Sequence, residues 1–263
     1  MYLVVGCGLS GATIAERIAT ILEEPVTIIE KRDHIGGNCY DYVEPFTNIR
    51  MNKYGAHLFH TNNKRVWDYI NKFSIWVRWE HQVLAKVSKD NYVPLPVNIT
   101  TVNKLCNKNL QTEQEMEEWL HRNQEKYKEI TNSEEMAKSR IGKELYDKLI
   151  KEYTYKQWNK YPEELDPEVL ARIPIRANFD PRYFADKYQA LPKDGYTQFF
   201  EKMLDNPLIN VKLNTSLESL SENELSKYDK IIYTGPIDAY FKNRYEPLEY
   251  RSINFDIQRL YNV

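Results

Sequence analysis

The chain has few of the residues and segments that mark several classes of protein. Its 263 residues include only three cysteines, and the spacing of Cys7, Cys39 and Cys106 fits no metal site. An odd number of cysteines favours reduced thiols in a cytosolic protein over a disulfide framework. No apolar run approaches the length of a bilayer span, and no secretory signal precedes the apolar stretch that begins at Tyr2. We therefore expect a cytoplasmic protein without a membrane span.

An excess of one charge is also missing. The 36 basic and 38 acidic residues give a net charge of −2, which is no reason to expect nucleic acid or an anionic membrane as a partner. The chain has no internal repeat and no low-complexity tract. Its aromatic content is high, with 20 tyrosines, 9 phenylalanines and 5 tryptophans. Because buried tyrosines need hydrogen-bond partners, clusters of them suit sites that bind sugars or flat rings.

The N-terminus carries the pattern of a dinucleotide-binding turn. Residues 3–5 are apolar and predict a strand, G-x-G-x-x-G follows at 6–11, and a helix is expected over 12–22. The first glycine permits a tight turn, the second lets a pyrophosphate approach the backbone, and the third lets the helix pack close to the strand. An anion would then face the unpaired N–H groups at the start of the helix.

A second predicted strand, 26–29, ends in Glu30 at nearly the spacing that the dinucleotide pattern requires. A carboxylate there can bind both hydroxyls of an adenosine ribose and would repel a 2′-phosphate. The alternative is a solvated strand end. The loop 31–38 is basic and contains the adjacent Gly36 and Gly37, which allow close approach of the backbone to a ligand. The alternative for this loop is a simple turn.

The middle of the chain differs from a doubly wound α/β pattern. From 101 to 158 it is charged, free of proline and helix-forming, which indicates a helical insertion. Thr131-Asn132-Ser133-Glu134 fits a capping box at the start of one helix. Prolines at 162, 167 and 174 then mark loops and a domain boundary. The other expected elements are strands over 76–87, 92–97, 208–213 and 228–235 and a helix over 196–204.

His57 and His60 lie in a segment that is dense in polar and aromatic residues. They are three residues apart and would share a face if the segment were helical. They could be metal ligands, although no partner set with metal spacing accompanies them. They could also be core histidines with satisfied hydrogen bonds.

Several longer motifs follow one another along the chain. They are the glycine turn at 6–11, R-D-H-I-G-G-N at 32–38, Y-G-A-H-L-F-H-T at 54–61, I-G-K-E-L-Y at 141–146, Y-T-Y-K-Q-W at 153–158, R-I-P-I-R at 172–176, D-G-Y-T at 194–197 and G-P-I-D-A at 235–239. In this order they resemble the UDP-galactopyranose mutase family of flavoenzymes over essentially the whole chain. The motifs at 54–61 and 153–158 are far more specific than a glycine turn.

The resemblance implies a mixed α/β (α+β) fold: a Rossmann-like FAD-binding domain with a helical insertion and an antiparallel substrate-side sheet. It implies an isomerase that interconverts UDP-galactopyranose and UDP-galactofuranose for cell-surface polysaccharide biosynthesis. In the family the N5 atom of reduced FAD attacks the anomeric carbon, UDP leaves, and the sugar closes through a different hydroxyl without net redox change. The cofactor carries the chemistry and the protein positions it.

Candidate site residues follow from the resemblance. His57 and His60 would lie near the isoalloxazine, and Arg172 would close over the diphosphate, because a planar guanidinium matches phosphate oxygens; these three are the expected catalytic residues. The residues expected to bind the cofactor are Gly6, Gly8, Leu9, Ser10, Gly11, Glu30, Lys31, Arg32, Gly36, Gly37, Asn38 and His57. Those expected to bind the UDP-sugar are His81, Tyr153, Thr154, Trp158, Arg172, Tyr183 and Arg251.

The resemblance also predicts how the chain is organised. The expected parts are an FAD-binding domain of 1–75 and 196–240, a helical domain of 98–165, and substrate-side strands within 76–97, 166–195 and 241–263. Two departures from the family are expected to matter. Leu149 stands where a phenylalanine is common, and the chain stops where the family continues with further phosphate-binding residues.

The shortened C-terminus would expose sheet edges, which a homodimer could cover. Two alternatives to an active mutase therefore stay open. One is an inactive truncated relative that binds nucleotide or a partner chain. The other is an ordinary flavin or NAD oxidoreductase, against which the motif at 153–158 argues.

Overall fold

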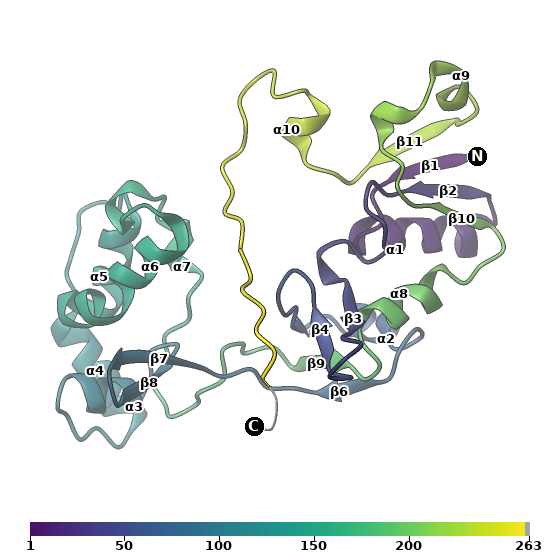
Figure 1. Cartoon of the computed structure of the whole chain (residues 1–263). Coiled ribbons are helices and arrows are strands. Elements are labelled where there is room, and N and C mark those ends of the chain that lie inside the picture. Colours follow the sequence, from purple (N-terminus) through teal and green to yellow (C-terminus); the bar gives the residue numbers. More distant parts are fainter. Residues whose placement is uncertain (261–263) are drawn as a thin grey trace. The chain divides into compact units, whose positions relative to one another are not determined.

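The computed structural model describes residues 1–260 of the chain. These residues divide into two compact units (Figure 1). The first unit comprises residues 1–79 and those from 186 onward, and the second comprises residues 80–185. The second unit is therefore an insertion into the first, and each is described by itself.

A four-stranded parallel sheet forms the centre of the first unit. Its strands are β1 (Tyr2–Val5), β2 (Val26–Ile29), β10 (Ile209–Lys212) and β11 (Lys230–Tyr233), in the spatial order β10-β2-β1-β11. Tyr2 lies opposite Val26 on one side and opposite Lys230 on the other, so β1 is paired along both edges. All four strands were predicted, and their parallel pairing produces the α/β sheet expected from the N-terminal pattern.

The two faces of β1 are covered by different elements. The helices of this unit are α1 (Leu9–Arg17), α2 (Lys64–Ile70), α8 (Tyr196–Leu204), α9 (Glu222–Leu225) and α10 (Ile237–Tyr240), with the shorter helical turns η1 (Ile18–Leu22), η2 (Gly37–Cys39) and η5 (Leu217–Ser219). Val4 packs with α1 and η1. Leu3 and Val5 face the other way and pack with residues of η5 and α9, since successive side chains of a strand alternate between faces.

Helix α8 begins at Tyr196, as predicted, but a distant residue caps it. The N-cap residue Gly195 has no side chain, and the buried Asp41 carboxylate accepts hydrogen bonds from the N–H groups of Tyr196 at 2.7 Å and Thr197 at 2.9 Å. A carboxylate is stabilised there by the unpaired N–H groups and the helix dipole. This contact fixes Asp41, which follows the loop 31–38 and begins the next strand, against α8.

Two small antiparallel sheets complete the first unit. One pairs β3 (Asp41–Val43) with β4 (Arg50–Asn52), and the other has the order β5-β9-β6, with β5 (Phe59–Thr61), β6 (Trp76–Arg78) and β9 (Tyr188–Pro192). Aromatic rings of Phe59, Trp76 and Phe199 pack between the second sheet and α8. These aromatic rings are therefore part of the core of the first unit.

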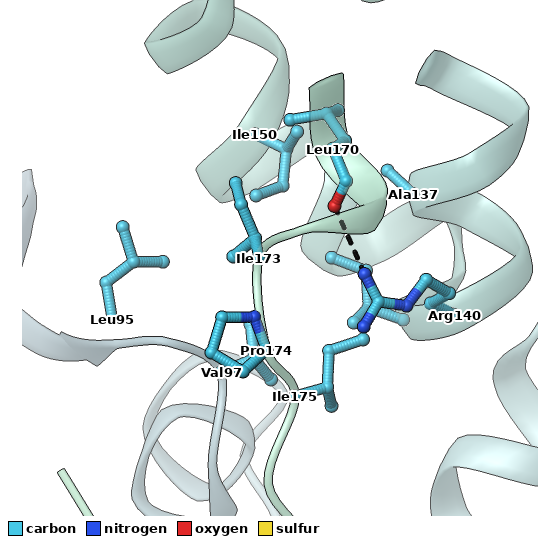
Figure 2. Close-up of a pocket in the computed structure, with 10 residues that line it drawn as sticks. Leu95, Val97, Ala137, Arg140, Ile150, Leu170, Ile173, Pro174 and Ile175 are labelled. Atoms are coloured by element: carbon cyan, nitrogen blue, oxygen red, sulfur yellow. Dashed lines mark hydrogen bonds between the residues drawn. The ribbon is translucent and has the colours of Figure 1, made fainter. Parts of the chain in front are cut away.

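The second unit combines a hairpin with helices around one apolar core. Its elements are β7 (Val83–Ser88), β8 (Asn91–Leu95), α3 (Ile99–Leu105), α4 (Glu113–Asn123), α5 (Ser133–Leu145), η3 (Tyr146–Ile150), α6 (Lys151–Trp158), η4 (Pro162–Glu164) and α7 (Glu168–Ala171). Val93 and Val97 pack in the same core as Ile141, Leu145 and Leu149. The apolar side chains that recur along α5 and η3 are thus core. A small apolar cavity lies in this unit, between α5, α7 and the segment 173–175 (Figure 2).

Local details of the second unit differ from those expected. The predicted capping box is absent: Asn132 is the N-cap and accepts from the N–H of Glu135 at 3.0 Å, while the Glu135 carboxylate accepts from the N–H of Thr131 at 2.8 Å. Helix α5 is interrupted at Gly142, whose φ of 76° is left-handed. A Cβ there would lie 2.3 Å from the Asn123 carbonyl oxygen, so this close approach requires glycine.

The structure also distributes the predicted substrate-side segments differently from the expected domains. The hairpin β7–β8 shares the core of the helices, whereas β6 and β9 belong to a sheet of the first unit. From 241 to 260 the described chain has no strand, and 261–263 fall outside the described residues. Hairpin and helices group together because both bury apolar side chains in one core.

Candidate functional site

A cavity of about 570 Å³ opens at the carboxyl ends of β1 and β2 in the first unit. In parallel sheets ligands bind at this end of the strands. The cavity is lined by Val5, Gly6, Gly8, Leu9, Ser10, Ile29, Glu30, Lys31, Arg32, Gly37, Asn38, Thr215, Ser216, Leu217, Glu218, Tyr233, Thr234, Gly235, Pro236 and Ala239. Nine of the residues expected to bind a cofactor therefore surround one space.

The glycine turn is built from unusually close backbone contacts. A Cβ on Gly11 would lie 1.9 Å from the Gly6 carbonyl oxygen, and one on Gly37 would lie 2.9 Å from the Gly8 Cα. Gly6 also has a left-handed φ of 101°. Gly11 and the buried Gly36 do not line the cavity but support the backbone that does. The turn and the loop 31–38 thus form one wall of the cavity in which backbone atoms, without side chains, face the space. A pyrophosphate needs such close access to the backbone.

Helix α1 begins at this wall. Its N-cap is Gly8, and among the described residues no side chain caps its first turn. The exposed Leu9 and Ser10 are its first residues and line the cavity. The N–H groups and the positive end of the helix dipole therefore face the space, which suits an anionic ligand.

Glu30 joins β2 to the glycine turn. Its Oε2 accepts from the N–H of Cys7 at 2.9 Å and its Oε1 accepts from the N–H of Arg32 at 3.0 Å. Glu30 is only 6% exposed, so the alternative of a solvated strand end is wrong. Each carboxylate oxygen can accept more than one hydrogen bond, so the group retains capacity for ribose hydroxyls.

Arg32 is held over the loop 31–38 by two contacts. Its guanidinium donates to Oδ1 of Asn38 at 2.9 Å and stacks over the Tyr54 ring at 4.6 Å. The Tyr54 hydroxyl lies 2.8 Å from Nε2 of His34, and Nδ1 of His34 lies 2.9 Å from the Ile35 carbonyl. Because a carbonyl only accepts, Nδ1 carries the proton and Nε2 accepts from Tyr54. Tyr54 was not predicted as a site residue.

His57 and His60 do not share a helix face. His60 lies in β5, with Nδ1 2.9 Å from the Asp186 carboxylate, while His57 lies in the preceding loop. Nδ1 of His57 lies 3.0 Å from the Gly55 carbonyl, which places the proton on Nδ1 and leaves Nε2 as an acceptor in the neutral ring. Neither histidine lines the cavity described above. Among the described residues, no cluster of His, Cys, Asp and Glu could hold a metal ion.

The second unit holds most of the residues expected to bind substrate. Thr154 is 1% exposed in α6, and its hydroxyl has no hydrogen-bond partner among the described residues. Trp158, four residues on, lies half-buried on the same helix face. Tyr153 is half-exposed and interacts with Tyr183 and Arg172: burial and Tyr183 raise its pKa, and Arg172 opposes this. Leu149 lies in the core.

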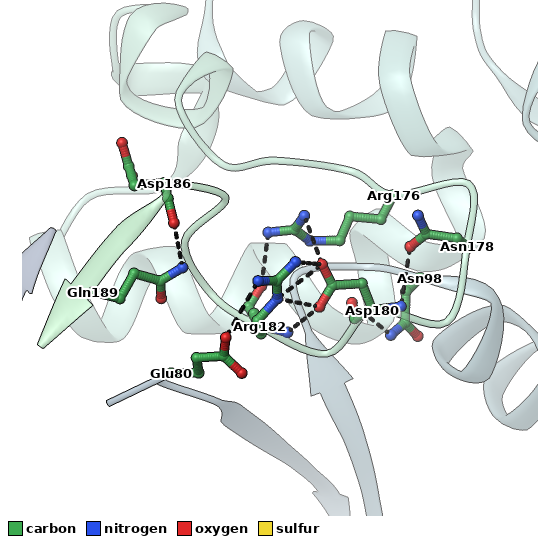
Figure 3. A network of polar contacts seen from close by, with 8 residues as sticks. All are labelled: Glu80, Asn98, Arg176, Asn178, Asp180, Arg182, Asp186 and Gln189. Carbon is green, nitrogen blue, oxygen red and sulfur yellow. Dashed lines mark hydrogen bonds and ion pairs between the residues drawn. The ribbon is translucent and has the colours of Figure 1, made fainter. Parts of the chain in front are cut away.

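A polar network shapes the segment that carries Tyr183 (Figure 3). The Asp180 carboxylate binds Arg182 at 2.8 Å and Arg176 at 3.4 Å, and these guanidinium groups lower the pKa of Asp180 to about 2. The N–H of Tyr183 donates to the His81 carbonyl at 2.7 Å, and the two rings meet edge to face at 6.2 Å. This backbone hydrogen bond and ring contact bring together two predicted substrate-binding residues that lie far apart in the sequence.

Other residues complete the account of the predicted site. Arg251 lies in the exposed chain after α10. Residues 215–218 and Thr234 line the cavity, although they were not predicted and no residue pattern singled them out.

The three free cysteines are protonated at neutral pH. Burial raises the pKa of Cys7 to about 12 and those of Cys39 and Cys106 to about 11. Within residues 1–260, no helix is long and apolar enough to span a bilayer.

Sequence comparisons match two parts of the chain to known families. The family described as UDP-galactopyranose mutase matches residues 148–262, and the family described as NAD(P)-binding Rossmann-like domain matches residues 4–73. The chain is 37% identical over 254 residues to a protein named "Probable UDP-galactopyranose mutase" in Klebsiella pneumoniae, covering 97% of this chain and 65% of that protein.

Two further relatives are covered to two thirds of their length or more. The chain is 34% identical to the dTDP-fucopyranose mutase of Escherichia coli, over 97% of this chain and 68% of that protein. It is 31% identical to the UDP-galactopyranose mutase of Mycoplasma pneumoniae, over 98% of this chain and 67% of that protein. The chain thus spans about two thirds of the length of these curated relatives.

A solved structure agrees with the fold. The crystal structure of a reduced UDP-galactopyranose mutase has a TM-score of 0.70 with this chain, at 17% identity, covering 92% of this chain and 56% of that one. At this identity the likeness bears on the fold alone. It supports the mixed α/β, Rossmann-like fold described above.

Proposed function

Because this chain belongs to the UDP-galactopyranose mutase family, we propose that it binds FAD in the cavity of the first unit and serves the interconversion of UDP-galactopyranose and UDP-galactofuranose. One observation carries the proposal. The glycine turn, the start of α1 and the buried Glu30 line a single cavity at the carboxyl end of the parallel sheet. That is the arrangement by which a protein binds the ADP half of a dinucleotide.

The residues present fit that half of the cofactor. The bare backbone at Gly8 and Gly37 leaves room for a pyrophosphate beside the first turn of α1. Glu30 would accept hydrogen bonds from the ribose hydroxyls, and its charge disfavours a 2′-phosphate. Arg32 and Asn38, which hold each other, would bind further along the cofactor.

The second unit would bind the nucleotide part of the sugar donor. Thr154 offers a buried hydroxyl without a partner, which a hydrogen-bonding group of the ligand would satisfy. Trp158 would offer an aromatic face, Tyr153 and Tyr183 hydroxyls, and Arg172 an exposed guanidinium for the diphosphate. His81 supports Tyr183 through its carbonyl.

Reduced FAD would supply the nucleophile for the sugar's anomeric carbon. His57 and His60 would lie near the flavin, where the acceptor Nε2 of His57 could hold a proton donated by the ligand. Arg251 would bind at the edge of the substrate site. The cytoplasmic location and a homodimer also remain predictions.

Cofactor retention and sugar isomerisation test the proposal together. The purified chain should be yellow, and after reduction with dithionite it should convert UDP-galactofuranose to UDP-galactopyranose, measured by chromatography of the nucleotide sugars. A dTDP-sugar serves as the comparison substrate. A colourless protein that takes up no FAD would overturn the cofactor assignment. FAD retention without conversion would instead favour a nucleotide-binding relative, and steady consumption of NAD(P)H would favour an ordinary oxidoreductase.

A further inference from the structure

Arg140 holds the chain immediately before Arg172. This arginine lies on α5, and its Nη1 atom donates to the Leu170 carbonyl oxygen at 3.1 Å (Figure 2). The same atom donates to the Ala171 carbonyl oxygen at 2.9 Å. These carbonyls end the short helix α7, for which Arg172 is the C-cap residue. A cation at this end of a helix satisfies carbonyls that have no partner within the helix.

The surroundings of Arg140 are unusual for a charged group. It faces the apolar cavity of the second unit, together with side chains of Ile141, Ile150 and Ile173. Burial lowers its pKa, and no carboxylate contributes to the shift. The desolvation cost of this guanidinium is therefore offset by backbone carbonyls and not by an ion pair.

The contacts surround Arg172 without touching its side chain. Before it, Leu170 and Ala171 are held through their carbonyls. After it, residues 173–175 line the same cavity as Arg140. Arg172 itself is exposed. A helix of four residues has too few internal hydrogen bonds to be stable alone, so the position of the backbone at Arg172 depends on tertiary anchoring.

We propose that Arg140 is a positioning residue for Arg172: it anchors the end of α7, from which Arg172 closes over an anionic ligand. This rests on the proposed function, which assigns the diphosphate to Arg172. Fixing the segment beforehand lowers the entropy lost when the ligand binds. Loss of the Arg140 contacts should therefore weaken diphosphate binding when Arg172 is present and have little effect when Arg172 is absent.

A double-mutant cycle with UDP as the probe tests this coupling. Arg140→Ala should raise the dissociation constant of UDP about fivefold to tenfold, measured by titration calorimetry on the full chain. In an Arg172→Ala background the same substitution should change it by less than about twofold. Arg140→Lys, which keeps the charge without the planar fork, should recover only part of the affinity. Arg122→Ala, on an exposed face of α4, is the matched control and should have no effect.

Trypsin gives a readout that does not depend on UDP. Arg140→Ala should speed native-state cleavage after Arg172 at least about threefold relative to the wild type and to Arg122→Ala, because release of α7 exposes the segment. A lower unfolding midpoint with unchanged UDP affinity and unchanged cleavage would mean that Arg140 is merely structural and would overturn the proposal. So would equal losses of affinity in both backgrounds. If the wild-type chain binds no UDP, the proposed function fails, and the cleavage rate still decides whether Arg140 holds the segment.

Discussion

The Oε2 atom of Glu30 accepts a hydrogen bond from the backbone N–H of Cys7 over 2.9 Å. This bond ties the end of β2 to the glycine turn that follows β1. The same carboxylate accepts from Arg32 through its other oxygen. One buried acid therefore holds the glycine turn and the loop 31–38 together, which makes Glu30 both a structural residue and a candidate cofactor ligand.

Substitution of Glu30 should weaken FAD binding and lower the free energy of unfolding together. Glu30→Ala leaves two backbone N–H groups without their acceptor, so the free energy of unfolding should fall by about 1–3 kcal/mol. The FAD dissociation constant should rise at least about tenfold, while UDP affinity should stay unchanged. Flavin fluorescence titration and urea unfolding measure these effects, with the exposed Glu201→Ala as the control. Unchanged FAD affinity would contradict the ribose role.

Two glycines of the turn should respond differently to alanine. At Gly8 an added Cβ would meet only the Gly37 Cα, at 3.9 Å, and φ is −83°. Gly8→Ala should therefore change the unfolding free energy by less than about 0.5 kcal/mol and still weaken FAD binding, because the methyl group enters the cavity. Gly11→Ala should cost about 2 kcal/mol or more, since its Cβ would lie 1.9 Å from the Gly6 oxygen. Equal unfolding midpoints for the two variants would argue against this geometry.

Thr154→Val should separate stability from ligand binding. The Thr154 hydroxyl is buried without a partner, so replacing it by a methyl group should leave the unfolding free energy equal or raise it by about 1 kcal/mol. UDP affinity should fall at the same time if the ligand satisfies that hydroxyl. Thr131→Val, at an exposed helix start, provides the contrast, because its hydroxyl already binds Glu135 at 2.9 Å. A destabilised Thr154→Val would indicate an unseen partner.

The Asp180 network predicts a dependence of stability on pH. Its arginines lower the pKa of Asp180 from 3.8 to about 2. The contribution to stability is therefore complete above about pH 4 and is lost as the pH falls through 2. Asp180→Asn should lower the unfolding free energy by about 1–2 kcal/mol at pH 7, after allowance for solvent screening, and by progressively less below pH 4. Denaturant unfolding from pH 7 to pH 2 measures the unfolding free energies of the wild type and of Asp180→Asn. The difference between them should shrink as the pH falls, whereas the exposed Asp90→Asn, the control, should match the wild type throughout.

The cysteines should be inert in the folded chain. Burial raises the pKa of each thiol to about 11 or 12, so at pH 8 about one thiol in a thousand or fewer is a thiolate. Iodoacetamide should label the native protein slowly and should label all three cysteines quickly in urea. Rapid native labelling of Cys7 would show that the glycine turn opens readily.

Elements that depend on short stretches of chain could be predicted from the sequence. The strands at Leu3 and Val26 and the helix at Tyr196 have their apolar patterns and glycines within a few residues of one another. The glycine turn needs no distant contact to be recognised, because its backbone geometry requires glycine at fixed spacing.

Contacts between distant residues could not be predicted in this way. Asp41 caps a helix that begins 155 positions later, and residues 215–218 close a cavity that begins at Gly6. The helix face expected for His57 and His60 is absent, because Phe59 to Thr61 pair with β9 as a strand. Asn132 caps α5 in place of the expected capping box, because asparagine is also a good N-cap residue.

The amino-acid sequence by itself determined the dinucleotide-type turn, the order of the main elements and the family, since these depend on local residue types and spacing. Only the tertiary structure decided that Glu30 is buried, that the hairpin β7–β8 belongs with the helices, and that Arg140 holds the carbonyls before Arg172. The reason is physical: local backbone preferences act over a few residues, whereas burial and long-range hydrogen bonds exist only once the chain has packed.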